Sequence, residues 1–283
     1  MNNLDNLIAL AAKLPKGYKE NAEELLERMG TVIEGIGDDG IAWKPPILRL
    51  VQGTTDRTSI PRGTAIGDFV LGEDRVERPL KFIPLLIWNG RQYWSPDQTE
   101  NKMLCNSPDA KLGYVGTYCN QCPKAKWNEE ENKSECSRIK QALCITEDLK
   151  DVFTVNFAKT NYATGMDFES LLKKAGVSPY RRVYELDSKT NSKNKNVENF
   201  AVKPADEKAT KPELLEFLAE LFKIVQGDRK ESLDSFYKIV LERKERAPQL
   251  AGPADADSTV MLTDETSGGG EAAVSDMAKN YVV

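Results

Sequence analysis

Residues 105–136, CNSPDAKLGYVGTYCNQCPKAKWNEEENKSEC, hold four of the five cysteines in a chain of 283 residues. The four are Cys105, Cys119, Cys122 and Cys136, and only two residues separate the central pair. Such a pair places both thiols on one side of a tight turn, and zinc binds four soft ligands of this kind at tetrahedral corners. The spacing therefore predicts one structural Zn²⁺, because four thiolate ligands leave no coordination position open for catalysis.

Other uses of these thiols stay open at the level of sequence. A redox-active pair, two disulfides, unconnected thiols or an iron–sulfur cluster are all compatible with the cysteine count. The fifth cysteine, Cys144, stands in the apolar run QALCI, which predicts a small buried side chain. It is also the obvious substitute ligand if one of the outer two cysteines does not bind the metal.

The sequence on either side predicts an α+β protein with four parts. Residues 1–43 form an N-terminal helical segment, and residues 44–204 form a β-rich core with the zinc module inserted at 95–150. Residues 205–247 form C-terminal helices, and residues 248–283 are a disordered acidic tail, since they are too poor in apolar side chains to offset the entropy of an ordered chain. Apolar spacing typical of helices covers residues 4–36, with a break near Pro15 and Gly17.

Short apolar runs bounded by turn residues predict the strands of the core. They cover residues 47–51, 66–71, 80–88, 152–157, 182–186 and 197–202. Asn89-Gly90 predicts a hairpin turn into residues 91–94, because this dipeptide tolerates positive φ. A short helix is predicted from Phe168 to Ala175, ending at Gly176.

Charge is unevenly distributed along the chain. Residues 248–283 contain six acids and one base, a net charge of −5, which equals the net charge of the whole chain, so residues 1–247 sum to zero. A neutral body of this kind is not typical of a DNA-condensing protein. It fits a protein whose basic residues are confined to one groove.

Bases alternate with aromatic residues between positions 157 and 204. Nine Lys or Arg residues against five acids give this segment a charge of +4. Cations that follow phosphates and rings that stack on bases hold single-stranded nucleic acid, although a solvated sheet face above core aromatics has the same pattern. The candidate binding residues are Lys159, Tyr162, Arg181, Arg182, Tyr184, Lys189, Lys193 and Lys195.

Enzymatic classes are disfavoured by what the sequence lacks. The chain contains no histidine, which excludes Ser-His-Asp and Cys-His catalysis and histidine metal sites. No glycine-rich loop matches a dinucleotide or Walker pattern, and Asp38, Asp39 and Asp68 offer a nuclease no paired metal site. With no apolar run long enough for a membrane helix and no signal-peptide pattern, we expect a cytoplasmic protein that is not an enzyme.

The four-cysteine insertion, the β-rich body and the acidic C-terminus together resemble bacteriophage-type single-stranded DNA-binding proteins of the OB-fold class with an inserted zinc ribbon. The resemblance covers residues 44–204 and the tail, and it rests on Cys119-Asn120-Gln121-Cys122-Pro123 and Cys105-Asn106-Ser107-Pro108-Asp109. It implies that the barrel groove binds the strand, that zinc stabilises the barrel and that the tail recruits replication or transcription proteins. Two features depart from the family: no histidine is present, and the chain ends KNYVV without a dense acidic run or terminal Phe.

Two functions follow as expectations. The first is non-specific binding of single-stranded DNA in phage DNA replication, recombination or transcription, in the host cytoplasm. The second is a structural or assembly protein in which zinc only supports a fold used for protein contacts. The basic and aromatic segment favours the first, and the neutral body favours the second.

Overall fold

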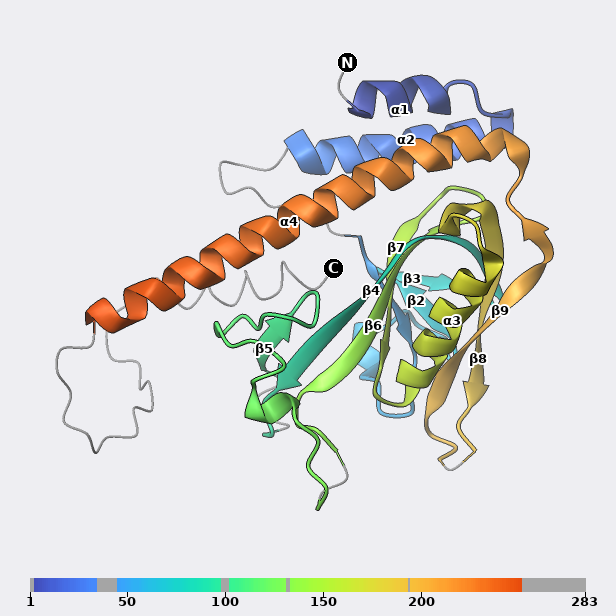
Figure 1. Cartoon of the computed structure of the whole chain (residues 1–283). Helices are drawn as coiled ribbons and strands as arrows, with labels where there is room; N and C mark the ends of the chain where they lie inside the picture. The colour runs from blue at the N-terminus through green and yellow to red at the C-terminus, as the bar shows by residue number, and fades with distance from the viewer. Residues whose placement is uncertain (1–2, 35–44, 98–101, 131–132, 193, 251–283) are drawn as a thin grey trace, which may run out of the picture. The chain divides into compact units, whose positions relative to one another are not determined.

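The computed structural model describes residues 3–34, 45–97, 102–130, 133–192 and 194–250, which fall into two compact units. The first unit comprises residues up to Asn89 together with Arg138–Arg229. The second comprises the described residues of Gly90–Ser137 and of 230–250. Both helices and strands are present, so the predicted α+β class is confirmed (Figure 1).

Two helices come first along the described chain, β1 to β7 follow, and α3 and α4 stand before and after β8 and β9. The α-helices are α1 (Asn3–Ala11), α2 (Lys16–Glu34), α3 (Tyr162–Ala175) and α4 (Leu215–Leu250). The strands are β1 (Ile47–Leu50), β2 (Phe69–Leu71), β3 (Asp74–Val76), β4 (Leu80–Trp94), β5 (Met103–Ser107), β6 (Ser137–Thr146), β7 (Val152–Ala158), β8 (Arg182–Thr190) and β9 (Glu198–Ala209). Short 3-10 turns are η1 (Arg57–Ser59), η2 (Pro123–Ala125), η3 (Lys159–Asn161), η4 (Pro179–Arg181) and η5 (Pro212–Leu214).

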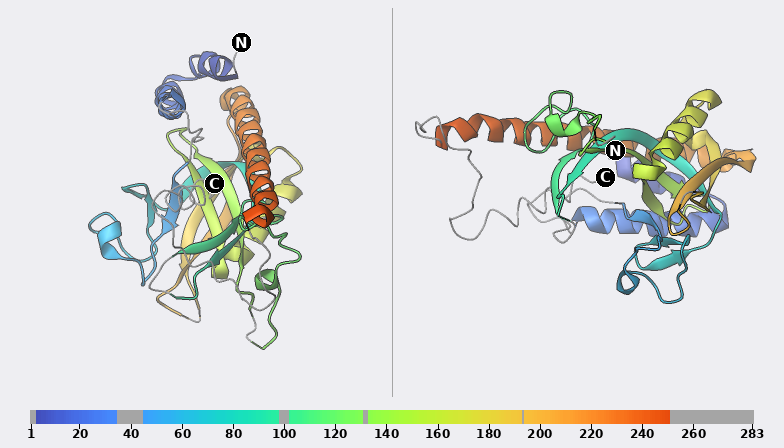
Figure 2. Two further views of the ribbon diagram at one scale, coloured as in Figure 1. Left: turned by 90° about the vertical axis from the view of Figure 1, so that its left-hand side faces the viewer. Right: turned by 90° about the horizontal axis from the view of Figure 1, so that it is seen from below.

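The sheet of the first unit has the strand order β3-β2-β1-β7-β6-β4-β8-β9. It curls strongly into a half-barrel, which is compatible with the predicted OB-like core (Figures 1 and 2). Side chains alternate across it, as strand geometry requires. In β6, Ala142 and Cys144 pack into one hydrophobic cluster, whereas Leu143 and Ile145 pack into another on the opposite face.

One face of the sheet is filled by aromatic side chains. Phe82 of β4 contacts Phe168 of α3 at a ring distance of 5.7 Å, and Phe168 contacts Tyr184 of β8 at 5.2 Å, both edge to face. Phe157 contacts Phe168 and Phe200. These contacts fix α3 against the sheet, because edge-to-face pairs add stability beyond the area that they bury.

The other face is covered by helices. Leu7 of α1, Leu25 of α2 and Leu218 of α4 lie in one hydrophobic cluster with Ile83 and Leu143 of the sheet. The apolar spacing that predicted a helical N-terminus is confirmed, as is the break before α2. α3 is also confirmed, and it ends at Gly176, whose φ of 65° is the left-handed geometry that glycine adopts most easily.

Beyond β1 the chain is tied to the β8–β9 hairpin by amide hydrogen bonds. The Gln52 side chain accepts from Glu198 N at 2.8 Å and donates to Glu198 O at 3.0 Å, which imitates one step of a strand ladder. Gly53 N donates to Asn196 O at 2.9 Å. A side chain at Gly53 would lie 2.9 Å from that oxygen, so glycine is required for this approach.

The second unit is built on the end of β4 and on β5. Arg91 pairs with Ser107 and Tyr93 with Cys105 in antiparallel register. A small apolar cluster forms where Leu112 meets Phe236 and Val240 of α4. Polar contacts reinforce it: Tyr237 Oη is 2.7 Å from Asp109 Oδ2, and Arg243 Nη1 is 2.9 Å from Tyr114 Oη.

Three boundaries differ from those predicted. The prediction of a hairpin turn at Asn89-Gly90 was wrong, because β4 runs unbroken through both residues. Its first residues pair with β8 and its last with β5, and pairing along both parts outweighs the local turn preference. The four-cysteine insertion ends at Ser137 rather than at 150, since β6 belongs to the main sheet. α4 continues to Leu250, past the predicted tail boundary at 248, and residues 251–283 lie outside the described residues.

Candidate metal centre and nucleic-acid interface

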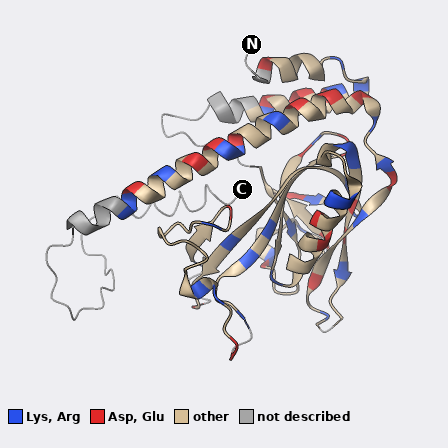
Figure 3. Ribbon diagram, in the orientation of Figure 1, with Lys and Arg blue, Asp and Glu red and all other residues tan. Residues whose placement is uncertain are grey.

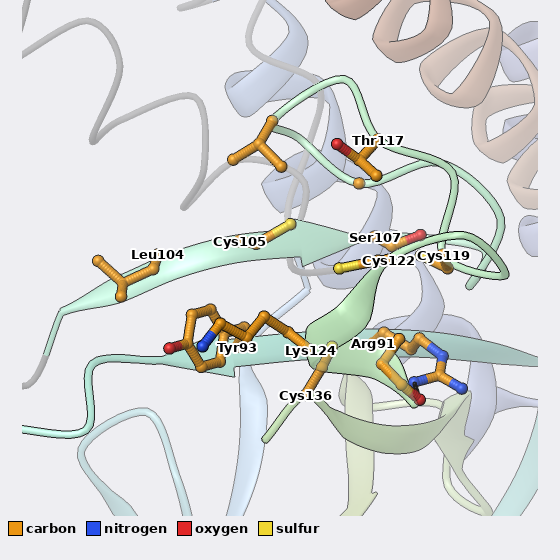
Figure 4. A pocket seen from close by; sticks show the side chains of 13 residues that line it. Arg91, Tyr93, Leu104, Cys105, Ser107, Thr117, Cys119, Cys122, Lys124 and Cys136 are labelled. Carbon is orange, nitrogen blue, oxygen red and sulfur yellow. Dashed lines mark hydrogen bonds between the residues drawn. The ribbon is translucent and has the colours of Figure 1, made fainter. Parts of the chain in front are cut away.

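The four cysteines of residues 105–136 come from three separate segments of the second unit. Cys105 lies in β5, Cys119 and Cys122 stand in the turn before η2, and Cys136 precedes β6. All four line one cavity of about 220 Å³ (Figure 4). The four thiols that the sequence grouped are therefore brought to one place by the fold.

Backbone hydrogen bonds shape the turns that carry these thiols. The amides of Gln121 and Cys122 both donate to Tyr118 O, at 2.9 and 3.0 Å, which closes the Cys-x2-Cys turn. Cys119 N donates to Lys111 O at 2.7 Å, and Cys136 N donates to Lys124 O at 2.8 Å. Each cysteine of the central and C-terminal segments is thus positioned by a main-chain contact and not only by its side chain.

Gly113 makes room for Cys105. A Cβ atom at Gly113 would lie 2.8 Å from the sulfur of Cys105 and 3.3 Å from the carbonyl oxygen of Thr117. The amide of Gly113 also donates to Thr117 O at 2.9 Å, so the backbone cannot move away without losing this bond. No pattern in the sequence indicated this role.

The thiols lie in an environment that favours their neutral form until a cation arrives. Burial raises the pKa of Cys105, of Cys119 and, to about 11, of Cys136. Backbone amides of Tyr114 and Val115 oppose the effect at Cys105, and Arg91 opposes it at Cys136. A metal ion held by these residues would displace the thiol protons, because its charge would stabilise the thiolates.

The residues around the cavity agree with a soft metal by their chemistry. Among the residues that the structure describes, no Asp or Glu lines the cavity, and all four cysteines are free of disulfides. Thiolates select zinc or iron–sulfur centres over hard cations. As placed, however, no three Cys, Asp or Glu side chains of the described segments are grouped closely enough to hold a metal ion. The four thiols fit zinc as a donor set, and they would have to close around the ion to bind it.

Cys144 has no part in this cavity. Its side chain is fully buried in the aromatic cluster of the first unit, where burial raises its pKa well above that of a free thiol. The prediction that it packs as a small apolar residue is confirmed.

The predicted nucleic-acid residues occupy two ends of the first unit. Lys189 and Lys195 are exposed near the tip of the β8–β9 hairpin, and Lys193 lies outside the described residues. The exposed Arg181 and the half-buried Arg182 stand at the other end of β8, which at about 3.3 Å per residue is roughly 26 Å away. A single DNA strand would therefore have to follow a path of that length to contact both ends of β8. Otherwise it would contact only one of them.

Lys159 and Tyr162 belong to the hairpin end. Lys159 is exposed in η3 and Tyr162 is half-buried at the start of α3. This segment is tied to β9 next to the hairpin tip, because Phe200 N donates to Asn161 Oδ1 at 2.6 Å and Thr164 Oγ1 donates to Phe200 O at 3.2 Å. Four of the candidate residues, Lys159, Tyr162, Lys189 and Lys195, thus lie toward one end of the sheet.

The prediction that Tyr184 binds nucleic acid is wrong. Its side chain is only 2% exposed and packs against Phe82 and Phe168 in the aromatic cluster. It cannot stack on a base without opening the core. The alternation of bases and rings in the sequence did not distinguish rings on the inner face of the curled sheet from rings at its edge.

Sequence reasoning missed the loop from Val51 to Asp68. The loop carries Arg57 and Arg62 and touches the hairpin tip through the Gly53–Asn196 hydrogen bond. Arg57 donates to a carbonyl oxygen, that of Thr64, and Arg62 is exposed. A second segment that carries positive charge therefore contacts the hairpin tip at Gly53, and only the fold reveals this contact, because residues 53 and 196 are far apart in sequence.

Asp68, considered above as an acid for a nuclease, is occupied by structural contacts. It is buried, pairs with Arg75 at 3.0 Å and with Arg78 at 3.5 Å, and accepts from Ala65 N at 2.8 Å. Arg78 also contacts Asp187 and Ser188 of β8. These partners give Asp68 the role of joining the β2–β3 hairpin to β8.

No protein-family model, no curated protein and no solved structure matches the chain. None of the described helices is both long and apolar enough to cross a membrane.

Proposed function

We propose that the protein binds single-stranded DNA without sequence preference, in phage DNA replication, recombination or transcription, and that a structural Zn²⁺ stabilises its second unit. Cys105, Cys119, Cys122 and Cys136 are the proposed ligands. The observation that carries the metal part is their convergence on one cavity with no carboxylate in its lining. All four ligand positions are filled by protein sulfur, so the metal supports structure and takes no part in a reaction.

The DNA part is supported by the hairpin end of the curled sheet. Lys159, Lys189 and Lys195 lie there, Arg57 and Arg62 are added by the loop between β1 and β2, and Tyr162 offers a half-exposed ring. Cations attract phosphates of any sequence, and a ring stacks on any base. This arrangement suits binding without sequence preference better than base-specific readout.

Titration of a labelled oligonucleotide with the full chain tests the DNA part. Fluorescence anisotropy is measured on a single strand and on a duplex of the same sequence, each at about 50 and about 200 mM salt. We expect tighter binding to the single strand and a large loss of affinity at the higher salt, because phosphate contacts release counterions. Absence of binding to either oligonucleotide at low salt would overturn this function.

A second candidate, a structural or assembly protein, is favoured by the exposed apolar side chains of the second unit. Trp127 is 62% exposed, Val115 60%, Tyr118 42% and Trp94 41%. Exposed aromatic residues are typical of protein interfaces. This function would be supported if the protein bound no oligonucleotide and if Trp127→Ala abolished its association with other protein chains.

A further inference from the structure

The proposed metal centre has a charge that its surroundings must balance. Four thiolates around a divalent ion leave a formal excess of negative charge, and this excess sits in a cavity that burial partly shields from water. Of the described residues that line the cavity, two are cations, Arg91 and Lys124, and none is an acid. One of these two side chains is the natural counter-charge.

Lys124 is already paired. Its Nζ lies 2.9 and 2.8 Å from the two carboxylate oxygens of Glu135, and it stands 5.7 Å from the centre of the Tyr93 ring. Glu135 also accepts from Tyr93 Oη at 3.1 Å. The charge of Lys124 is therefore directed to this exposed carboxylate and away from the thiols.

Arg91 has a different set of contacts. It lies in β4 opposite Ser107, on the same strand face as Tyr93, and both residues line the cavity (Figure 4). Its Nη1 donates to Ala125 O at 3.2 Å in η2, the turn that directly follows Cys122. Within the described part of the chain no carboxylate pairs with it, which leaves its remaining N–H groups for the sulfurs.

Arg91 shares the cavity with the thiols that it would balance. It lines the same cavity as Cys119 and Cys136, whose side chains are buried. The hydrogen bond to Ala125 O orients its guanidinium beside the turn that carries Cys122.

We propose that Arg91 is a positioning residue of the four-cysteine centre: its guanidinium fork holds the η2 turn through Ala125 and balances the charge of the Cys119 and Cys136 thiolates. The inference rests on the proposed metal centre and goes beyond it, since it names what tunes the site. Arginine suits both tasks because its planar group donates several hydrogen bonds in fixed directions, whereas lysine is a point charge on a flexible stem.

Metal affinity of full-length variants tests the inference. Wild type, Arg91→Gln, Arg91→Lys and the control Lys126→Gln are loaded with Zn²⁺, and transfer of the ion to a chromophoric chelator gives the dissociation constant. Lys126 is exposed and is not among the residues that line the cavity. We expect Arg91→Gln to lose about 10- to 100-fold in affinity, the range typical of outer-shell partners, and Arg91→Lys to fall between it and wild type.

Absorption of the Co²⁺-loaded proteins separates a tuning role from a merely structural one. Loss of the Arg91 donor should shift the sulfur-to-cobalt charge-transfer band while the tetrahedral d–d bands persist. A wild-type protein that takes up no metal removes the metal centre and this inference together. Metal uptake by wild type with equal affinity and an unshifted band in Arg91→Gln overturns the inference alone. If Arg91→Gln does not fold, Arg91→Lys decides: weaker binding than Lys126→Gln supports the inference, and equal binding overturns it.

Discussion

At the scale of single residues, the five cysteines divide into two chemical roles. Cys122 lines the four-cysteine cavity, whereas Cys144 is fully buried among aromatic side chains of the first unit. The same substitution, thiol to hydroxyl, therefore has different consequences at the two positions.

We predict that Cys122→Ser abolishes zinc binding, because a hydroxyl is a poor ligand for zinc and three thiolates leave the site incomplete. Cys144→Ser should keep the metal and lose about 1–3 kcal/mol of unfolding free energy, since it places an unsatisfied hydroxyl in a dry core. Elemental analysis and urea unfolding measure the two effects. Retention of zinc by Cys122→Ser together with its loss in Cys144→Ser would reverse the assignment of ligands.

Gly113 offers a second test at this scale. Gly113→Ala should weaken zinc binding, because the new methyl group would stand 2.8 Å from the Cys105 sulfur. Gly227→Ala is the matched control: Gly227 lies within α4 with no atom within 4 Å of an added Cβ, so alanine should stabilise the helix by about 0.5–1 kcal/mol. Chelator competition and thermal unfolding of both variants are the measurements, and equal zinc affinity in the two would contradict the close approach.

Two tyrosines test the distinction between core and surface. Tyr184→Ala should destabilise the first unit by about 3–5 kcal/mol, the cost of removing a large buried ring. Tyr162→Ala should leave stability nearly unchanged and weaken DNA binding by about 1–3 kcal/mol if its half-exposed ring stacks on a base. Urea unfolding and anisotropy titration on the same preparations separate the effects. A stability loss confined to Tyr162→Ala would contradict the assignment of Tyr184 to the core and of Tyr162 to the surface.

At the scale of elements, the curled sheet places basic residues at two ends of β8, and DNA need not use both. The hairpin end has Lys189 and Lys195, supported by the loop that carries Arg57 and Arg62. The other end has Arg181 and Arg182, next to η4. The hairpin end combines the lysines of the tip with a contact to a second loop that carries two arginines.

We therefore predict that Lys189→Gln with Lys195→Gln weakens binding of single-stranded DNA. The slope of log affinity against log salt should become shallower by about 2, roughly 1 for each lost phosphate contact. Arg181→Gln with Arg182→Gln, a pair of equal charge change, serves as the comparison and should have the smaller effect. Titration over a series of salt concentrations gives the slope of log affinity against log salt for each double variant. A larger slope change in the arginine pair would move the interface to the far end of β8.

At the scale of the whole molecule, the two units differ in what holds them together. The first unit has two extensive hydrophobic clusters, one on each face of its sheet. The second has a small cluster around Leu112, Phe236 and Val240, and apart from it the four-cysteine cavity. Its cohesion should accordingly depend far more on the metal.

Removal of zinc by a strong chelator should thus unfold the second unit and leave the first one folded. Trp127 in the second unit and Trp88 in the first are the reporters: fluorescence of a Trp127-only variant should change on chelation, while that of a Trp88-only variant should not. Re-addition of Zn²⁺ should restore the first signal. A single cooperative unfolding of both reporters would show that the units do not separate in this way.

The amino-acid sequence by itself determined the local features of this protein. The α+β class, the helical N-terminus with its break before α2, the end of α3 at Gly176 and the identity of the four clustered cysteines all follow from spacing, propensity and turn chemistry. The buried, apolar character of Cys144 followed as well. These are properties of neighbouring residues, which the order of the chain states directly.

Only the tertiary structure decided the features that join distant segments. It extended β4 through Asn89-Gly90, because partners on both parts of the strand outweigh the turn preference, and it assigned β6 to the main sheet. It turned Tyr184 inward, since the side of a curled sheet to which a ring points depends on the whole register. It also brought Arg91 beside the thiols and Gly53 beside Asn196, and contacts across such separations arise from packing of the entire chain, which no local pattern encodes.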